Sequence, residues 1–365
     1  MKKQKWVGFT FVNGLLLLIV ILWSIPTLGL LVSSFRVPFD IQTSGWWTVF
    51  PHKEWETVSV IEKPRETLGV DPDTVMEIEG VTGTFEEFRE GVASGDLQVT
   101  WVGNKRIGRV EVQEQVWTVN WDFTLQNYET VVFGRDMVIQ NPDGSSLTIP
   151  GQDMQQAFLN SMAVAIPSTV IPILIAAFAA YAFAWMKFPA RRWFFIMVVA
   201  LLVVPLQIAL VPILSDYNAL GINGEFLSVW LAHTGFGLAL ATYLLYNYIS
   251  TLPRETLESA FIDGASHFTV FTKLVLPLSV PALASFAIFQ FLWVWNDYLV
   301  ALVFLGVDPS KKVLTQRLAD LTGTFGNAWH LLTAGAFVTM ILPMIVFIVL
   351  QRYFVRGLMA GSVKG

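Results

Sequence analysis

The chain has 365 residues, of which 54% are hydrophobic and only 14% are charged, and its mean hydropathy is +0.56. An ordinary soluble protein carries about a quarter charged residues, so this deficit argues against a soluble class. The 14 Trp and 28 Phe favour a chain that contacts lipid, and collagen, disorder and nucleic-acid binding are excluded. With no Cys in the chain, disulfides, thiolate catalysis and Cys-based metal sites are excluded as well.

Six mainly apolar runs reach the length of about 18 or more residues that a helix needs to cross a bilayer. They are residues 7–32, 158–186, 193–214, 226–248, 278–305 and 331–350. The first run follows Lys2, Lys3 and Lys5, as the core of a signal peptide would. Its length exceeds an apolar signal core of about 7–15 residues, and no small-x-small cleavage pattern follows closely. We therefore interpret it as a retained anchor.

The distribution of Lys and Arg predicts the orientation of these spans. With six spans both termini share one side, which collects eleven Lys and Arg residues against three in the short loops opposite. The eleven are Lys2, Lys3, Lys5, Lys187, Arg191, Arg192, Arg254, Lys273, Arg352, Arg356 and Lys364, and the three are Lys311, Lys312 and Arg317. We expect both termini in the cytoplasm.

A polar insert separates the first two runs. Residues 34–158 contain 20 Asp and Glu against 9 Lys and Arg, whereas the rest of the chain carries 8 acids and 14 bases. Thr84 with Glu87 three residues later predicts a capping box for a short helix, and strand-like runs at 97–102 and 107–121 flank a turn at 103–106. The sequence predicts a small α+β module outside the cytoplasm.

The fold class expected is therefore an all-α membrane protein of six transmembrane helices that carries this module. Its parts are residues 1–33 with the first span, the insert 34–157, a five-helix core 158–350 and a cytoplasmic tail 351–365. The core contains the longest cytoplasmic loop, residues 251–279. There a helix over 255–262, a bend at Gly264 and a second helix over 265–275, stopped by Pro277 and Pro281, predict a compact unit that a soluble partner can push.

This loop carries a resemblance. Glu258-Ser259-Ala260, Asp263-Gly264-Ala265 and Leu274-Val275-Leu276-Pro277 resemble the EAA loop of permease subunits in ABC importers. The spacing is kept, while Ser259 replaces the first Ala and Leu274 replaces an Ile. The resemblance implies that the loop binds an ATPase subunit, through Glu258, Ser259, Ala260, Asp263, Gly264, Ala265, Leu276 and Pro277. A glycine at position 264 is also expected on physical grounds, because glycine permits the bend and a close approach of another chain.

Other segments resemble the carbohydrate branch of this family, in particular the smaller permease of maltose-type transporters. They are residues 123–128, Asn160-Ser161, 291–297 and 352–358. The resemblance covers the first span and residues 120–365 but not the acidic insert, whose size is similar to that in α-glucoside permeases. It implies half of a sugar translocation path in a bacterial inner membrane. The implied partners are a second permease, two ATPase copies that bind ATP and Mg, and an extracytoplasmic sugar-binding protein.

Two further sites are candidates. Asn296 and Asp297 lie inside the fifth run, where an ionisable side chain is costly and indicates function; with Trp293 they could line the path, or Asp297 could be solvated or paired with a neighbouring helix. Trp293 and Trp295 lie on different helix faces, which favours packing over a shared sugar platform. By resemblance, the outer loop 306–330 would reach into the binding protein through Gly323, Thr324, Phe325 and Gly326, unless it is a plain connector.

Enzyme signatures are missing from the sequence. It has no phosphate-binding P-loop, no nucleophile elbow and no His-Glu-x-x-His, so we expect ATP chemistry only in a partner chain and no cofactor here. His52, His233, His267 and His330 share no ligand spacing, so no metal site is expected. Two alternatives remain: a stand-alone secondary transporter or channel, which would show inverted repeats and several mid-membrane charges, and a membrane-anchored ligand sensor.

Overall fold

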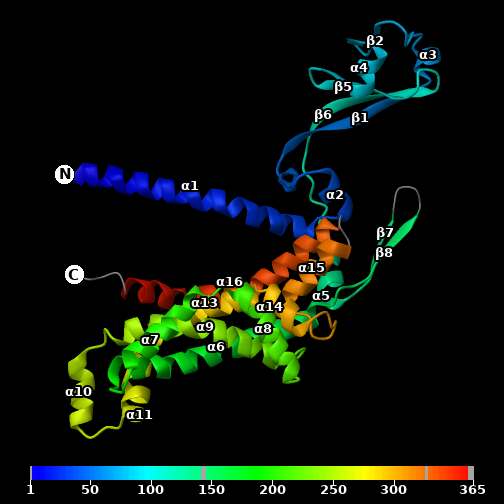
Figure 1. Ribbon diagram of the computed structural model, residues 1–365. Coiled ribbons are helices and arrows are strands. Elements are labelled where there is room, and N and C mark those ends of the chain that lie inside the picture. Colours follow the sequence, from blue (N-terminus) through cyan, green and yellow to red (C-terminus); the bar gives the residue numbers. More distant parts are fainter. Residues whose placement is uncertain (1, 141–144, 325–327, 361–365) are drawn as a thin grey trace. The chain divides into compact units, whose positions relative to one another are not determined.

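The computed structural model describes every residue except 1, 141–144, 325–327 and 361–365 (Figure 1). The chain divides into two compact units. Unit 1 combines Met1–Pro38 with Thr124–Gly365, and unit 2 is Phe39–Phe123. Unit 2 is thus inserted in the chain between the first and second helices of unit 1.

Unit 1 is built mainly from helices. They are α1 (Lys2–Phe35), α5 (Gln126–Phe133), α6 (Met154–Trp185), α7 (Arg191–Ala200), α8 (Leu206–Ala219), α9 (Phe226–Ile249), α10 (Arg254–Ile262), α11 (His267–Val270), α12 (Leu276–Leu278), α13 (Val280–Trp295), α14 (Leu299–Leu305), α15 (Leu314–Thr324) and α16 (Trp329–Ala360). A 3-10 turn, η2 (Leu201–Val203), follows α7, and a π turn, η3 (Phe271–Val275), follows α11. One antiparallel hairpin, β7 (Met137–Gln140) and β8 (Ser146–Ile149), lies between α5 and α6.

Four helices in the described part of the chain are long and apolar enough to cross a membrane. They are Phe9–Phe35, Met154–Trp185, Phe226–Ile249 and Trp329–Tyr353. Two bent helix pairs raise the number to six if each pair counts as one span. The predicted runs at 158–186, 226–248 and 331–350 thus correspond to single helices, whereas the third and fifth runs do not.

The third run, 193–214, is broken at Pro205. The helical segments on either side, Arg191–Val203 and Leu206–Ala219, are bent by 103°. Val204 has an extended ψ of 116°, as expected where the proline ring disfavours helical geometry in the preceding residue. The third run therefore consists of two helical segments that meet at Pro205.

The fifth run, 278–305, is also interrupted. Helix α13 ends at Trp295, and the Asp297 carboxylate accepts a hydrogen bond from the Val300 amide at 2.7 Å in the first turn of α14. Asp297 thus begins a new helix, because a side-chain oxygen replaces the partner that the amide lacks.

The expected stop at Pro277 is wrong as well. Helix α12 runs through Pro277, and the bend of 71° occurs between the segments His267–Leu278 and Val280–Trp295, at Ser279. Pro277 lies in the first turn of α12, where a missing amide hydrogen costs little.

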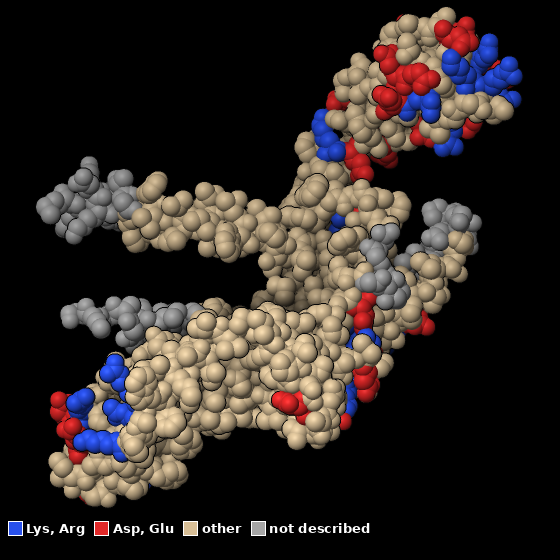
Figure 2. Space-filling model, in the orientation of Figure 1, with Lys and Arg blue, Asp and Glu red and all other residues tan. Residues whose placement is uncertain are grey.

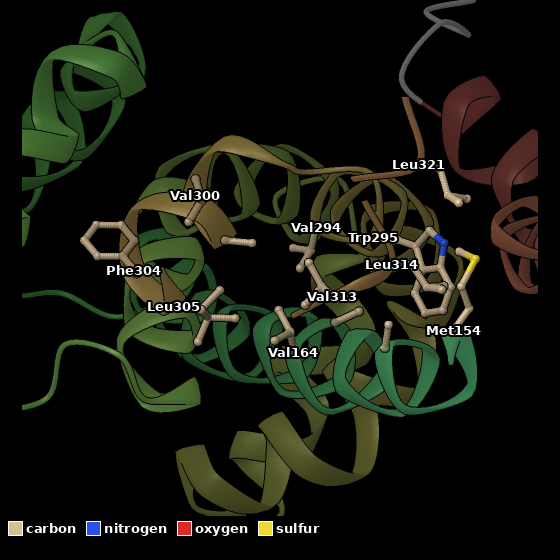
Figure 3. Packing of buried hydrophobic residues seen from close by; sticks show 14 of the residues in the cluster. Met154, Val164, Val294, Trp295, Val300, Phe304, Leu305, Val313, Leu314 and Leu321 are labelled. Carbon is tan, nitrogen blue, oxygen red and sulfur yellow. The ribbon is translucent and has the colours of Figure 1, made fainter. Parts of the chain in front are cut away.

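A hydrophobic core joins α6, α13, α14 and α15 (Figure 3). Trp295 is its largest labelled side chain and is 3% exposed. Its ring stacks on Phe291 at 5.5 Å between centroids and meets Phe158 edge-on at 5.6 Å. Its indole nitrogen donates to the Thr339 carbonyl at 2.9 Å. The predicted packing role of Trp295 is confirmed.

Unit 2 is an α+β module with a four-stranded antiparallel sheet in the order β1-β6-β5-β4. Its elements are α2 (Pro38–Thr43), η1 (Trp46–Val49), β1 (His52–Glu62), α3 (Pro64–Thr67), β2 (Met76–Ile78), β3 (Val81–Gly83), α4 (Phe85–Glu90), β4 (Val92–Ser94), β5 (Leu97–Gly103) and β6 (Gly108–Thr118). The two predicted strands correspond to β5 and β6, although β6 ends three residues earlier. Phe88 of α4 and Val99 and Val110 of the sheet are fully buried in one core.

The predicted capping box at the start of α4 is confirmed. The Thr84 amide donates to the Glu87 carboxylate at 2.7 Å, and the Glu87 amide donates to the Thr84 hydroxyl at 3.4 Å. The Thr84 backbone hydrogen bond holds the pKa of Glu87 below its usual value. This reciprocal pair therefore fixes where α4 begins.

Candidate functional site

The 251–279 loop is packed against unit 1 through buried apolar side chains. Leu257, Val270, Phe271 and Val275 are at most 2% exposed. They belong to one core with Tyr181 of α6 and with residues of α9. Because buried side chains are close-packed and transmit displacement, the loop forms a rigid extension of these two helices.

His267 connects three parts of this base. Its Nδ1 is hydrogen-bonded to the Tyr181 hydroxyl at 2.9 Å, and its ring meets Phe261 of α10 at 4.8 Å between centroids. Phe271 stacks against Phe178 of α6 at 4.4 Å. His267 shares no metal-ligand spacing with the other histidines, and its contacts join α10 and α11 to α6.

The opposite face of α10 is exposed. Glu258, Ser259 and Ile262 lie on it, at the three- and four-residue spacing that places side chains on one helix face. Ile262 is 85% exposed, and Phe268 at the start of α11 is 67% exposed. In the described part of the chain, neither Glu258 nor Asp263 forms an ion pair. Two apolar side chains beside two unpaired carboxylates are a surface suited to another protein.

Sequence reasoning missed Ile262 and Phe268. The signal was the helical spacing, since Leu257 and Phe261 face inward and leave Ile262 on the outer face with Glu258. Of the other residues predicted here, Ala260, Ala265 and Leu276 are half-buried, while Asp263, Gly264 and Pro277 are exposed. The structure therefore places these eight residues in two layers rather than on one surface.

Gly264 makes the predicted bend. Its φ is +82°, and the Ala265 amide donates to the Ala260 carbonyl at 3.0 Å, which closes the end of α10. A β-carbon at this position would meet no atom of the described chain within 4 Å. Glycine is therefore required here by backbone geometry, and the expected close approach is not made within this chain.

Charge within unit 1 gathers at its ends. In Figure 2 the Lys, Arg, Asp and Glu side chains cluster at the end that carries α10 and α11, while the long surface between is almost entirely uncharged. Exposed apolar side chains such as Leu174, Phe178 and Leu231 belong to the helices of this body. The 251–279 loop thus lies at a polar end of an apolar body.

At the second candidate site, Asp297 lines a small cavity whose walls are mainly apolar. Asp297 lines about 10 Å³ of space together with Ser161, His233 and Trp295. A cavity of this size holds about one water molecule. Trp293 is 37% exposed and meets the His233 ring edge-on at 5.2 Å. His233 therefore contacts Trp293 and shares a cavity with Asp297, and this cavity is too small for a sugar.

Asn296 is not part of this cavity. It is exposed, and its amide nitrogen donates to the Leu292 carbonyl of its own helix at 2.8 Å. No group of three or more His, Asp or Glu side chains in the described residues could hold a metal ion.

The third candidate, the 306–330 loop, is anchored to the start of α6. The Asn160 side-chain amide donates to the carbonyls of Ser310 and Lys312, each at 2.9 Å, and the Leu314 amide donates to the Ser161 hydroxyl at 2.8 Å. The Asn160-Ser161 pair thus has a structural role. Of the predicted contact residues, Gly323 and Thr324 end α15, and Phe325 and Gly326 lie outside the described residues.

Comparison with known proteins places this architecture in a family. Residues 151–359 match the family described as binding-protein-dependent transport system inner membrane component. The alpha-glucoside transport system permease protein AglG of Rhizobium meliloti (strain 1021) is 45% identical over 96% of this chain and 95% of its own length. The osmoprotective compounds uptake permease protein GgtD of Synechocystis sp. (strain ATCC 27184 / PCC 6803 / Kazusa) is 45% identical over 96% of this chain and 90% of its own length.

A solved structure, titled crystal structure of bacterial alginate ABC transporter in complex with alginate pentasaccharide-bound periplasmic protein, contains a chain with a TM-score of 0.44. It is 15% identical to this chain and covers 55% of this chain and 77% of its own length.

The family match and the matches to single relatives differ in whether they include the insert. The family match begins at residue 151 and excludes it, whereas the two relatives leave only 4% of this chain unmatched. The insert of 125 residues therefore lies mostly inside their matched length. The expected similarity of the insert to α-glucoside permeases is thus supported by AglG, while the family match excludes the insert as expected. The resemblance to importer permeases is itself confirmed, and the chain belongs to the family of binding-protein-dependent transport system inner membrane components.

Proposed function

We propose that this chain forms half of the translocation path of an ATP-driven importer for a sugar or a glucoside. The name of AglG supports this substrate class, since it is named for alpha-glucosides. GgtD is named for osmoprotective compounds, which makes a non-sugar osmoprotectant the second candidate. The cavity at Asp297 holds about one water, which supports a path completed by a second permease subunit.

The observation that carries the coupling role is the exposed face of α10 over a buried base. An ATPase subunit that binds Glu258, Ser259, Ile262, Asp263 and Phe268 would move the ends of α6 and α9, because Leu257 and His267 join the loop to them. ATP and Mg would be bound by that subunit, and this chain would have no catalytic role.

This arrangement sets the topology that we propose. The ATPase is cytoplasmic, so the 251–279 loop and both termini lie in the cytoplasm, in agreement with the excess of Lys and Arg on that side. The 306–330 loop and unit 2 then lie outside, within reach of a substrate-binding protein. Residues 323–326 are the part of that loop that we propose to contact it.

The experiment compares two exposed isoleucines. Ile262→Asp places a charge on the outer face of α10, and Ile107→Asp places one on unit 2, where Ile107 is 80% exposed. Neither substitution changes a buried residue, so both variants should fold. In nanodiscs that contain both permeases, Ile262→Asp should lose ATPase co-purification and stimulated ATP hydrolysis, while Ile107→Asp should retain both.

The opposite result would contradict the coupling role. If Ile262→Asp bound the ATPase and supported stimulated hydrolysis at the level of Ile107→Asp, the outer face of α10 would not be the coupling surface. The substrate class is tested separately, by measuring hydrolysis with binding protein loaded with α-glucosides, other sugars or non-sugar osmoprotectants.

A further inference from the structure

We propose that one end of unit 2 lies in the lipid–water interface of the membrane, held there by exposed aromatic side chains. This surface, called the aromatic base here, consists of Phe39, Trp47, Phe50, Trp117, Trp121 and Phe123, each between 52% and 71% exposed. Exposing six large aromatic side chains to water is unfavourable, because burying each one would remove about 150–250 Å² of surface from solvent.

Hydrogen bonds hold these residues together at one end of the sheet. Trp117 lies opposite Lys53 near the last pair of the β1–β6 ladder. Beyond the ladder, the Asn120 amide donates to the Thr48 carbonyl at 2.9 Å, and the Trp121 indole donates to the Val49 carbonyl at 2.8 Å. The two segments that enter and leave unit 2 are therefore paired, so the residues that carry the exposed aromatic side chains lie at the same end of the sheet.

Charge is segregated away from this surface. Residues 39–51 and 116–123 contain only two charged side chains, Asp40 and Asp122, whereas residues 52–115 contain 21. Figure 2 shows the red and blue side chains of unit 2 gathered over the part made by the strands. An electrostatic protein contact would use the charged part, so the aromatic base needs an apolar partner that tolerates polar edges.

The chain itself identifies that partner as lipid. The apolar stretch of α1 ends at Phe35, and Phe39 follows only four residues later. Even a fully extended chain would place Phe39 within about 14 Å of Phe35. At the other connection the Thr124 amide donates to the Phe35 carbonyl at 2.6 Å, so Phe123 is one residue from the end of the same span. Trp side chains favour the interface, where the ring is apolar and the N–H meets water. Both connections thus keep aromatic residues at the depth where lipid headgroups begin.

Single-cysteine labelling tests this placement, because the natural chain contains no Cys. We would attach a nitroxide at Phe39→Cys of the aromatic base and at Val119→Cys, which lies between Trp117 and Trp121 in the chain. The labelled full chain would be assembled with its partner permease and ATPase in nanodiscs. The matched control is Ile107→Cys, at the other end of β6. It is exposed too, and the ten steps along β6 from Gly108 to Thr118 alone separate it from Val119 by about 34 Å.

The readout is accessibility to oxygen, which concentrates in lipid, against a water-soluble nickel chelate. We expect the oxygen-to-nickel ratio at Val119→Cys and Phe39→Cys to be several-fold higher than at Ile107→Cys. Equal ratios at the three sites would place the aromatic base in water and overturn the proposal. Protection from both reagents would show that another protein covers this surface, and would overturn it too. Neither result depends on the transport activity proposed above.

Discussion

Gly237 shows how one missing side chain allows two helices to share a hydrogen-bonded crossing. A β-carbon there would come within 2.6 Å of the Gln290 side-chain oxygen. Gln290 is 2% exposed, and its amide nitrogen donates to the Ser168 carbonyl at 3.1 Å and to the His233 carbonyl at 3.3 Å. Glycine on α9 thus leaves room for a side chain of α13 that ties together α6, α9 and α13.

We expect Gly237→Ala to displace Gln290 and break these bonds. The loss should lower the free energy of unfolding by roughly 1–3 kcal/mol, because buried polar groups are left without partners. Gly235→Ala on the same helix is the matched control, since no described atom beyond its chain neighbours and its own helix backbone lies within 4 Å of its β-carbon position. It should be neutral or stabilise by up to about 1 kcal/mol through helix propensity.

Denaturation midpoints in detergent micelles measure both variants against the natural chain. If Gly237→Ala were as stable as Gly235→Ala, the Gln290 hydrogen bonds would not support the helix crossing.

At the scale of elements, the features that depend on residues close in sequence were mostly predicted. The capping box at Thr84 and the apolar runs that became α6, α9 and α16 depend on residues within a few turns, so they could be predicted from sequence. The break at Asp297 is local as well, since the Val300 amide is three residues away. It was not predicted because the apolar run continues on both sides of Asp297 and favours a single span.

The candidate site on the 251–279 loop also has parts that could be predicted from sequence and parts that could not. The bend at Gly264 and the helix 255–262 follow from residue type and spacing. The buried side of the loop does not, because His267 finds Tyr181 at a separation of 86 residues. The exposure of Ile262 also depends on tertiary packing, because Leu257 turns the inner face of α10 toward α6 and α9.

Asn160 links two elements that are distant in sequence, and its replacement should free one of them. Asn160→Ala removes the hydrogen bonds to the Ser310 and Lys312 carbonyls, which costs about 1–3 kcal/mol for a buried partner. Backbone amides of residues 306–313 should then exchange hydrogen about tenfold faster or more, since 1.4 kcal/mol is a factor of ten.

Gln156→Ala is the control for this prediction. It removes only the bond from Gln156 to the Asn160 side-chain oxygen at 3.0 Å and leaves the contacts to the loop. Mass spectrometry of the 306–313 peptide distinguishes the two variants. Equal exchange in both would mean that other contacts, such as the Lys311–Glu225 ion pair at 2.7 Å, hold this loop alone.

For the whole molecule, the two connections to unit 2 meet at a single place on unit 1. The Thr124 amide is hydrogen-bonded to the Phe35 carbonyl at 2.6 Å, and the buried Asn127 side chain donates to the carbonyls of Ser34 and Arg36, each at 2.9 Å. Unit 2 also has a core of its own, around Phe88 and Trp101. The family match that starts at residue 151 agrees with a permease body that does not need the insert to fold.

Removal of unit 2 should therefore leave unit 1 intact. We expect a variant in which residues 39–123 are replaced by about four Gly and Ser residues to insert into the membrane and elute as a single species, because a short flexible loop adds little closure entropy. Binding of the ATPase through α10 should also be unchanged. The same deletion with Asn127→Ala is the control, and it should aggregate, since the end of α1 then loses two buried hydrogen bonds to α5. Size-exclusion chromatography in detergent separates these outcomes. Aggregation of the simple deletion would show instead that unit 1 depends on unit 2, and that the insert is part of the permease fold rather than a module added to it.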